Sequence, residues 1–303
     1  MKQAFIKLHI AVLLAGFTGI LGKLITLNEG WLVWYRLLLT SLTLWALALL
    51  RRQRIRLAVR DVLRIFGIGG IAALHWVAFY GSIKYSNVSV GLICFSAIGF
   101  FTALVEPLIF HHRVDWVELL LGLMVIAGIY LIFRVDPHYK TGILIGLVSS
   151  LLGSLFPVLN RRVLRSVPPE TVTLYELSGG FLWLSALMPL YLHYSPGGRS
   201  MPDAKDWLWL LVLSWVCTVL AFSLSMIALR KISAFTVNLS YNLEPVYGII
   251  LAFLVFREDR YLNTASYVGL FWILLAIGLQ MWRLRSGRLV SDITDKGSLG
   301  DRQ

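Results

Sequence analysis

The sequence predicts an all-α membrane protein with ten transmembrane helices, arranged as two inverted five-helix repeats. Three observations support this prediction: the composition, the lengths of the apolar runs, and an internal repeat. Of the 303 residues, 58% are hydrophobic and 15% are charged, whereas soluble domains carry roughly 25% charged residues. So few charged side chains could not cover a surface in water, and we therefore expect the bilayer to be the main solvent.

The net charge of +12 would suggest nucleic-acid binding in a soluble protein. In this chain the lysines and arginines lie mostly between apolar runs. We therefore expect them to set the membrane topology and to contact anionic lipid headgroups, and we expect no nucleic-acid partner.

The apolar runs are long enough to cross a hydrocarbon core of ~30 Å, which takes about 20 helical residues. The predicted spans cover about 8–27, 31–50, 62–83, 88–110, 114–133, 141–159, 172–194, 207–229, 232–256 and 262–282. We expect the first to be a retained span, because its apolar stretch is longer than the hydrophobic region of a usual signal peptide.

The two halves of the chain share a pattern. Residues 82–112 align without gaps with residues 229–259, which places Lys84 on Lys231. Because five helices per half is an odd number, the second half starts on the other side of the membrane, and a pseudo-two-fold axis lies in the membrane plane. The predicted domains are a first five-helix repeat over 5–133 and a second, inverted repeat over 141–282.

Arginines gather in the connections at 51–60 and 161–165 and after the last span at 283–288. All three segments fall on one side of the membrane if the N-terminus lies there too. The positive-inside rule then places both termini in the cytoplasm and the chain in the cytoplasmic membrane. The polar tail over 284–303 is predicted to be cytoplasmic as well.

Two segments resemble a known family. The piece VWYRLLLTSLTLWALALL resembles the second helix, and LRKISAFTVNLSYNLEPVYGIILAFLVFRED the ninth helix, of the EamA branch of the drug/metabolite transporter superfamily. In the latter, Pro245 lies within the span and Glu258 closes it. The resemblance covers about residues 5–282 and implies export or exchange of small metabolites, often amino acids, by alternating access.

The predicted ninth span contains the most polar helical face. Asn238, Tyr241, Asn242 and Pro245 recur at i, i+3, i+4 and i+7 and so share one side of a helix. Pro245 lacks an N–H and frees a carbonyl of the preceding turn, which is tolerated where backbone lines a cavity. This face indicates either a substrate-lining surface or a hydrogen-bonded seam between helices.

His75, in the middle of the third span, is either a hydrogen-bonding residue of the site or a satisfied packing residue. The aromatic residues Trp76, Phe79, Tyr80 and Phe222 also lie deep within their spans and could line an amphipathic cavity or pack against lipid. The predicted substrate-binding residues are His75, Trp76, Tyr80, Asn238, Tyr241 and Asn242.

An ionisable residue within a span costs roughly 3 kcal/mol on insertion scales, so each is expected to have a role. Arg36 and Glu176 each follow a tyrosine at matching repeat positions; they are either snorkelling or structural charges, or gate charges on opposite sides of a central cavity. Glu244 is a candidate proton-coupling acid. Lys23 either snorkels at the end of the first span or attracts a carboxylate. The predicted gating or coupling residues are Arg36, Glu176, Glu244 and Lys23.

The sequence contains no Walker motif, so ATP hydrolysis is not the expected energy source. It contains neither His-Glu-x-x-His nor a paired aspartate motif within the spans, and Cys94 and Cys217 fit small apolar positions. We therefore predict no enzymatic activity, no cofactor and no metal. The leading hypothesis is a secondary transporter of small metabolites such as amino acids, with protons as the candidate coupling ion; the alternative is a drug or lipid-carrier translocator on the same fold.

Overall fold

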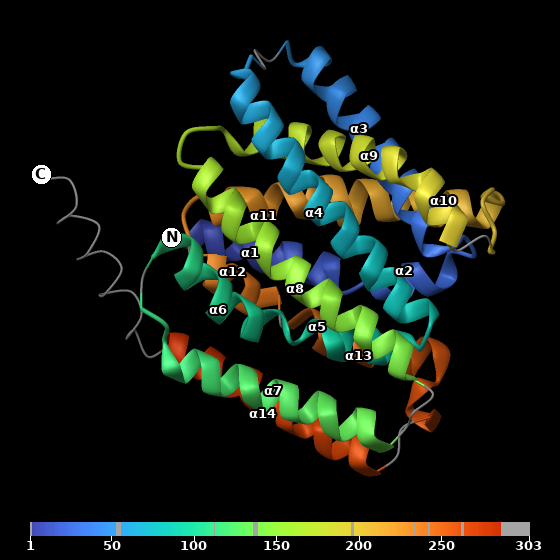
Figure 1. Cartoon of the computed structure of the whole chain (residues 1–303), viewed down its shortest axis with the longest axis vertical. Coiled ribbons are helices and arrows are strands. Elements are labelled where there is room, and N and C mark those ends of the chain that lie inside the picture. The colour runs from blue at the N-terminus through green and yellow to red at the C-terminus, as the bar shows by residue number, and fades with distance from the viewer. Residues whose placement is uncertain are drawn as a thin grey trace, which may run out of the picture.

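The computed structural model describes residues 2–52, 56–111, 113–135, 139–194, 197–232, 234–241, 243–261 and 264–285. Within these ranges the chain is built of helices (Figure 1). The first predicted repeat contains α1 (Lys2–Ala15), α2 (Thr18–Leu24), α3 (Glu29–Leu50), α4 (Val59–Lys84), α5 (Val88–Phe95), α6 (Ile98–Phe110) and α7 (Trp116–Val135). The second contains α8 (Lys140–Val163), α9 (Pro169–Tyr194), α10 (Ala204–Ser214), the π-helix η2 (Trp215–Leu220), α11 (Ala221–Leu229), α12 (Ala234–Tyr241), α13 (Leu243–Phe256), the 3₁₀ turn η3 (Glu258–Tyr261) and α14 (Thr264–Arg285).

The chain is a multi-pass membrane protein. Six helical segments of the described residues are both long enough and apolar enough to cross a bilayer: Gln3–Leu24, Glu29–Leu50, Val59–Lys84, Val88–Phe110, Lys140–Val163 and Ala204–Leu229. Shorter apolar helices cover Trp116–Leu131, Leu243–Phe256 and Tyr267–Ala276. Helix is thus found in each predicted span, while the predicted tail lies outside the described residues from position 286 onward.

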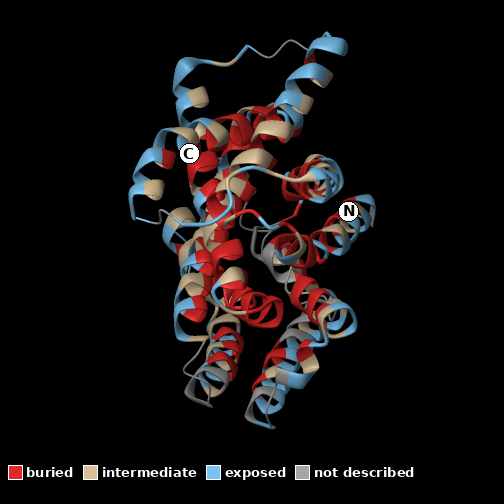
Figure 2. Ribbon diagram, turned by 90° about the vertical axis from the view of Figure 1, so that its right-hand side faces the viewer, coloured by how far each residue is buried: buried red, intermediate tan, exposed pale blue. Residues whose placement is uncertain are grey.

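Burial follows the same pattern. Buried residues form the interior of the bundle, and exposed residues follow the outer sides of the helices (Figure 2). The exposed residues include many large apolar side chains, among them Leu50, Leu254 and Phe271. An exterior with so many large apolar side chains is unfavourable in water and is expected where helices face lipid.

Two predicted spans are interrupted rather than continuous within the described residues. The first span breaks between α1 and α2, and the fourth breaks between α5 and α6. In the alignment that places Lys84 on Lys231, Phe95 at the end of α5 falls on Asn242, directly after α12. The counterpart of the break after Phe95 therefore falls at position 242, which lies outside the described residues.

Glycines let the central helices approach closely. α4 packs along both α8 and α9. A Cβ atom built on Gly69 of α4 would lie 2.0 Å from the carbonyl oxygen of Glu176 on α9, so only a hydrogen fits there. α7 and α14 pack together at one side of the bundle (Figure 1), where a Cβ on Gly128 would lie 2.7 Å from the carbonyl oxygen of Gly269.

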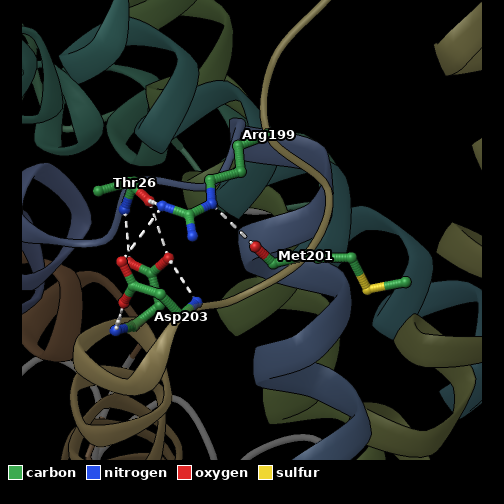
Figure 3. A network of polar contacts seen from close by, with 5 residues as sticks. Thr26, Arg199, Met201 and Asp203 are labelled. Atoms are coloured by element: carbon green, nitrogen blue, oxygen red, sulfur yellow. Dashed lines mark hydrogen bonds and ion pairs between the residues drawn. The ribbon is translucent and has the colours of Figure 1, made fainter.

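One end of the bundle, which we call the loop face, gathers residues 23–28, 84–89, 197–206 and η3. Lys84 Nζ donates to the carbonyl oxygen of Ile25 at 3.0 Å, and Leu27 forms a β-bridge with Arg199. Asp206 opens α10 as part of a capping box, and its Oδ1 and Oδ2 accept hydrogen bonds from the Thr26 backbone and hydroxyl at 2.7 and 2.8 Å. Figure 3 shows Arg199 reaching across this network toward Thr26, Met201 and Asp203.

The other end, which we call the arginine face, gathers Glu106, Phe110, Arg161 and Arg165. The guanidinium carbons of Arg161 and Arg165 both lie 5.6 Å from the ring centroid of Phe110. α8 connects the two faces, because its residue Gly142 accepts a hydrogen bond from Ser82 near the loop face. Between Gly142 and Arg161, α8 rises about 30 Å at 1.5 Å per residue, which is close to the thickness of a hydrocarbon core.

Candidate functional site

A cavity lies between the two predicted repeats. Its walls come from α1 to α6 of the first repeat and from α8, η2, α11, α12 and α13 of the second. No described residue of α7, α9, α10 or α14 lines it. The lining combines one guanidinium, one carboxylate, one imidazole and a set of aromatic rings, so it is an amphipathic site rather than a purely apolar one.

The guanidinium belongs to Arg36 of α3, which is buried. Its Nε donates to Thr218 Oγ1 at 2.7 Å, and its Nη1 donates to Tyr80 Oη at 2.9 Å. The guanidinium carbon lies 3.9 Å from the ring centroid of Trp76, which is a cation–π arrangement. Arg36 therefore does not snorkel; two neutral hydroxyls and an aromatic face fix it in the cavity wall, with donors left over for an anion.

The carboxylate belongs to Glu244, at the start of α13. Its Oε1 accepts a hydrogen bond from Thr18 Oγ1 of α2 at 3.2 Å. Thr18 also donates to the carbonyl oxygen of Ala15 at 2.7 Å, at the break between α1 and α2. Glu244 and Arg36 are not within ion-pair distance of each other in the described part of the chain, so the cavity presents a positive and a negative group separately.

The imidazole belongs to His75 of α4. Its Nδ1 lies 2.8 Å from the Ser149 carbonyl oxygen, and Ser149 Oγ donates to the His75 carbonyl oxygen at 3.1 Å. An Nδ1 that donates to a carbonyl leaves Nε2 as a hydrogen-bond acceptor in the neutral ring. His75 also packs between the rings of Phe79, Phe95 and Phe156, so both its tautomer and its orientation are fixed.

Aromatic rings form much of the remaining wall. Trp76 meets Phe222 edge to face, with centroids 6.0 Å apart, and Phe222 stacks on Phe156 at 6.2 Å. Tyr241, at the end of α12, also lines the cavity. Such rings offer a large apolar contact area with little conformational freedom to lose on binding.

The structure thus brings together five of the ten residues predicted for the site: Arg36, His75, Trp76, Tyr241 and Glu244. Tyr80 lies directly behind them as a partner of Arg36. The side chain of Asn238 and the whole of Asn242 lie outside the described residues, so their predicted contacts with substrate stay predictions.

Glu176 and Lys23 lie away from the cavity lining. Glu176 is fully buried, and both its carboxylate oxygens accept from Asn160 Nδ2, at 2.9 and 2.8 Å. Glu176 therefore does not face the cavity from the side opposite Arg36 in this conformation. Lys23 Nζ lies 2.7 Å from Glu258 Oε1. Of the two alternatives for Lys23, snorkelling or attracting a carboxylate, the structure thus shows the second.

Sequence reasoning missed Thr18 and Cys217 as lining residues. Thr18 lies in AGFTGILGKL, where a hydroxyl close to two glycines gives no periodic signal. Cys217 lies within the π-helix η2, and no sequence pattern predicts a π-helix at this position. The partner of Lys23 could have been sought among the carboxylates that close spans on the same side, and Glu258 is one of them.

Comparison with known proteins shows which family the chain belongs to. The EamA-like transporter family matches residues 3–134 and again residues 140–282. The chain belongs to the EamA-like transporter family. The same family thus matches each half of the sequence separately, and the two matches meet close to the start of α8.

Relatives of this EamA-like chain are themselves named as transporters. It is 24% identical over 266 residues to an "uncharacterized transporter" of Haemophilus influenzae, covering 81% of this chain and 83% of that protein. An "uncharacterized transporter" of Synechocystis sp. is 21% identical over 66% of this chain, and one of Archaeoglobus fulgidus 26% identical over 57%. The chain spans 58% and 59% of the lengths of these last two proteins.

The overall fold also has a counterpart among solved structures. One, titled "Crystal structure of protein", superposes with a TM-score of 0.67 over 95% of this chain and 99% of its own, at 18% sequence identity. At this level of identity the likeness concerns the fold. The family match and the transporter-named relatives point to a membrane transporter by class, and its cargo is left to be inferred from the cavity.

Proposed function

We propose that the protein is a secondary transporter that exports or exchanges small metabolites such as amino acids by alternating access. The observation that supports this most is the cavity, because both predicted repeats contribute to its wall and because it presents opposite charges within an aromatic enclosure. A site between two repeats near the middle of the membrane is where secondary transporters bind their substrates.

The charges suggest how a zwitterion would lie. A substrate carboxylate would meet the remaining donors of Arg36, whose planar fork suits two carboxylate oxygens. A substrate ammonium would meet Glu244, with the acceptor Nε2 of His75 available nearby in the same lining. The side chain would then contact the rings of Trp76 and Phe222. This arrangement favours small amino acid-like molecules over simple anions or cations.

The proposed architecture is ten spans in two inverted five-helix repeats, with both termini cytoplasmic and the chain in the cytoplasmic membrane. The separate family matches to residues 3–134 and 140–282 support the duplication. The gap-free alignment of residues 82–112 with residues 229–259 supports it as well. Arginines cluster at the arginine face around Arg161 and Arg165, which supports placing that face in the cytoplasm.

Protons are the proposed coupling ion, and Glu244 is the proposed carrier. Its carboxylate lines the cavity, is buried, and accepts a hydrogen bond from the neutral hydroxyl of Thr18. A carboxyl group in such a site can be neutral in one step of the cycle and ionised in another, as the substrate ammonium arrives or leaves.

A drug or lipid-carrier translocator is the second candidate, and the aromatic lining favours it. Rings from Trp76, Phe79, Phe95, Phe156 and Phe222 would accept an apolar cargo. The buried and hydrogen-bonded Arg36 weighs against it, because an apolar cargo would leave that cation without a counter-charge. The family and the transporter-named relatives point to transport rather than to an enzyme.

The experiment is an export panel. Cells with and without the protein are loaded with labelled amino acids and nucleosides, and efflux is measured for wild type and for Glu244→Gln, which removes the negative charge and keeps the side-chain size. We expect faster efflux of at least one amino acid in wild-type cells and a reduced rate in the variant at equal membrane expression. Efflux of an uncharged or apolar cargo alone would favour the translocator instead.

A further inference from the structure

Two of the ion pairs that join the predicted repeats in the described part of the chain lie on helices that also line the cavity or directly after them. On the loop face, Lys23 Nζ of α2 lies 2.7 Å from Glu258 Oε1 of η3. On the arginine face, Arg161 Nη1 of α8 lies 2.8 Å from Glu106 Oε1 of α6. Each pair joins a residue of the first repeat to a residue of the second. We call them the loop-face latch and the arginine-face latch.

The loop-face latch includes the start of a helix. Besides Lys23, the carboxylate of Glu258 accepts from the backbone N–H groups of Val88 and Ser89 at 3.2 and 2.8 Å, and from Ser89 Oγ at 2.7 Å. These N–H groups open α5 and have no partner within that helix. A carboxylate of the second repeat thus caps a helix of the first, at the end where the helix dipole favours negative charge.

The same contacts act on the ionisation of Glu258. Burial by itself would raise the pKa of this carboxyl group, but the hydrogen bonds from Lys23 and Ser89 outweigh burial and hold the pKa below its ordinary value. Glu258 is 1% exposed, whereas the side chain of Lys23 is 39% exposed. The carboxylate is therefore the buried centre of the latch, and the lysine lies at its rim.

The latches flank the cavity on opposite sides. On α2, Thr18 lines the cavity and Lys23 follows about 7.5 Å further along the helix. On α8, Pro157 lines the cavity and Arg161 follows about 6 Å further along. α2 runs toward the loop face and α8 toward the arginine face, so each latch lies about one or one and a half turns beyond the cavity wall.

The latches also correspond to each other in the predicted repeat. α8 is the counterpart of α1 and α2, and the interrupted pair α5–α6 is the counterpart of α12–α13. In each latch the cation comes from the first span of one repeat, and the carboxylate comes from the fourth span of the other repeat or directly after it. An in-plane two-fold axis would exchange the spans that carry the latches, although the alignment that places Lys84 on Lys231 puts Glu106 on Phe253 rather than on Glu258.

We propose that Lys23–Glu258 and Glu106–Arg161 are the two gates of the transport cycle, of which one breaks whenever the cavity opens to its face while the other stays closed. This inference rests on the alternating access proposed above. Glu258, Ser89, Glu106 and Arg161 then act as positioning residues, because they touch no substrate and set which face is open. In the present conformation both latches are formed.

The native Cys217 reports on this directly. It lines the cavity, whereas Cys94 is buried and does not, so the Cys94→Ala protein carries a single cavity thiol. Right-side-out and inverted membrane vesicles are treated with a membrane-impermeant maleimide, and the rate of Cys217 labelling is measured from each side. Lys23→Met should raise the rate from the loop face, and Arg161→Met should raise it from the arginine face, each by about tenfold, within the usual range of couplings between sites.

Each variant should also lower labelling from the other side, because the two open states compete for one population. The matched control is Arg283→Gln. Arg283 pairs with Asp115 and so also joins the two repeats, but it lies on α14, which does not line the cavity. Its removal should leave both rates unchanged.

A double variant separates a lost gate from a damaged fold. Glu106→Arg combined with Arg161→Glu restores the pair with reversed charges and should return labelling toward the wild-type rates. The proposal is overturned if both single variants favour the same side, if neither changes labelling, if Arg283→Gln acts like them, or if the double variant labels like Arg161→Met. The assay needs no substrate, so a failed export panel would leave its result interpretable.

Discussion

Arg36→Met tests whether the cavity recognises a substrate carboxylate. The substitution removes the guanidinium that Thr218, Tyr80 and Trp76 hold in place and leaves an apolar chain of similar length. A hydrogen bond to a charged group contributes about 1.5–3 kcal/mol. At 1.4 kcal/mol per factor of ten, losing one such contact with substrate raises KM by about 10- to 100-fold.

Some of the effect of Arg36→Met is structural. Two comparisons separate this structural effect from substrate recognition: the Arg36→Lys variant, and transport of a substrate amine that lacks the carboxylate. Thr218 Oγ1 keeps its hydrogen bond to the Leu213 carbonyl oxygen at 2.7 Å, but Tyr80 Oη loses its donor. Arg36→Lys keeps the charge without the planar fork, so we expect a smaller rise in KM, by about threefold to tenfold.

The assay is uptake by proteoliposomes over a range of substrate concentrations, with the amino acid found in the export panel and with its decarboxylated amine. We predict that Arg36→Met weakens transport of the acid and leaves the KM of the amine within about twofold of wild type, since a factor of two is only ~0.4 kcal/mol. Equal losses for acid and amine would show that Arg36 supports the fold and does not contact the carboxylate.

Four further predictions concern stability and topology. Glu258→Gln should lower the unfolding temperature in detergent more than Lys23→Met does. Removing the buried partner of an ion pair costs about 3–5 kcal/mol, whereas a partly exposed lysine contributes less. Equal decreases in the unfolding temperature would contradict the capping role of the Glu258 carboxylate. Folding lowers the pKa of Glu258. The ionised carboxylate therefore stabilises the folded protein above the pKa of about 4.3 in the unfolded chain, and this stabilisation is lost as pH falls through the pKa in the folded protein. Acidification should therefore destabilise wild type more than Glu258→Gln. Gly69→Ala should destabilise by about 1–3 kcal/mol through overpacking against α9, whereas Gly67→Ala, where a new Cβ meets nothing within 4 Å, should not. A cysteine at Ser200 should react with an impermeant reagent added outside cells, and protection of that cysteine would reverse the proposed orientation.

Much of the fold follows from the sequence because lipid simplifies the rules. Long apolar runs must become helices, since no other local structure satisfies the backbone in a bilayer. The all-helical membrane class and the EamA resemblance are therefore confirmed. The break after Phe95 was not predicted, because no proline lies near it and Ser96 and Ala97 bond within a tightened turn instead.

The site could be predicted in part. Arg36, His75 and Glu244 stand out because charged and ionisable groups within spans need partners. Their partners come from other helices: Arg36 binds Thr218, and Glu244 binds Thr18. Such pairs depend on how helices far apart in the sequence pack, which periodicity along one helix does not reveal.

The same limit explains the charges outside the cavity. The matching repeat positions of Arg36 and Glu176 predicted similar roles, but Glu176 faces Asn160 on the neighbouring helix. The charges that join corresponding spans are instead those of the latches, Lys23 with Glu258 and Arg161 with Glu106. A repeat in sequence therefore gives corresponding helices more reliably than corresponding side-chain roles.

The most direct measurement of the central claim is a chemical block of the cavity. The Cys94→Ala protein is reconstituted in liposomes, Cys217 is alkylated with a bulky maleimide, and counterflow of the labelled substrate is measured, with Cys217→Ser as the unreactive control. We predict that the loss of counterflow is proportional to the fraction of Cys217 alkylated. Excess substrate should slow both the alkylation and the loss of counterflow, and the Cys217→Ser control should keep its counterflow. Complete alkylation of Cys217, verified by mass, with undiminished counterflow would show that the substrate does not pass through this cavity.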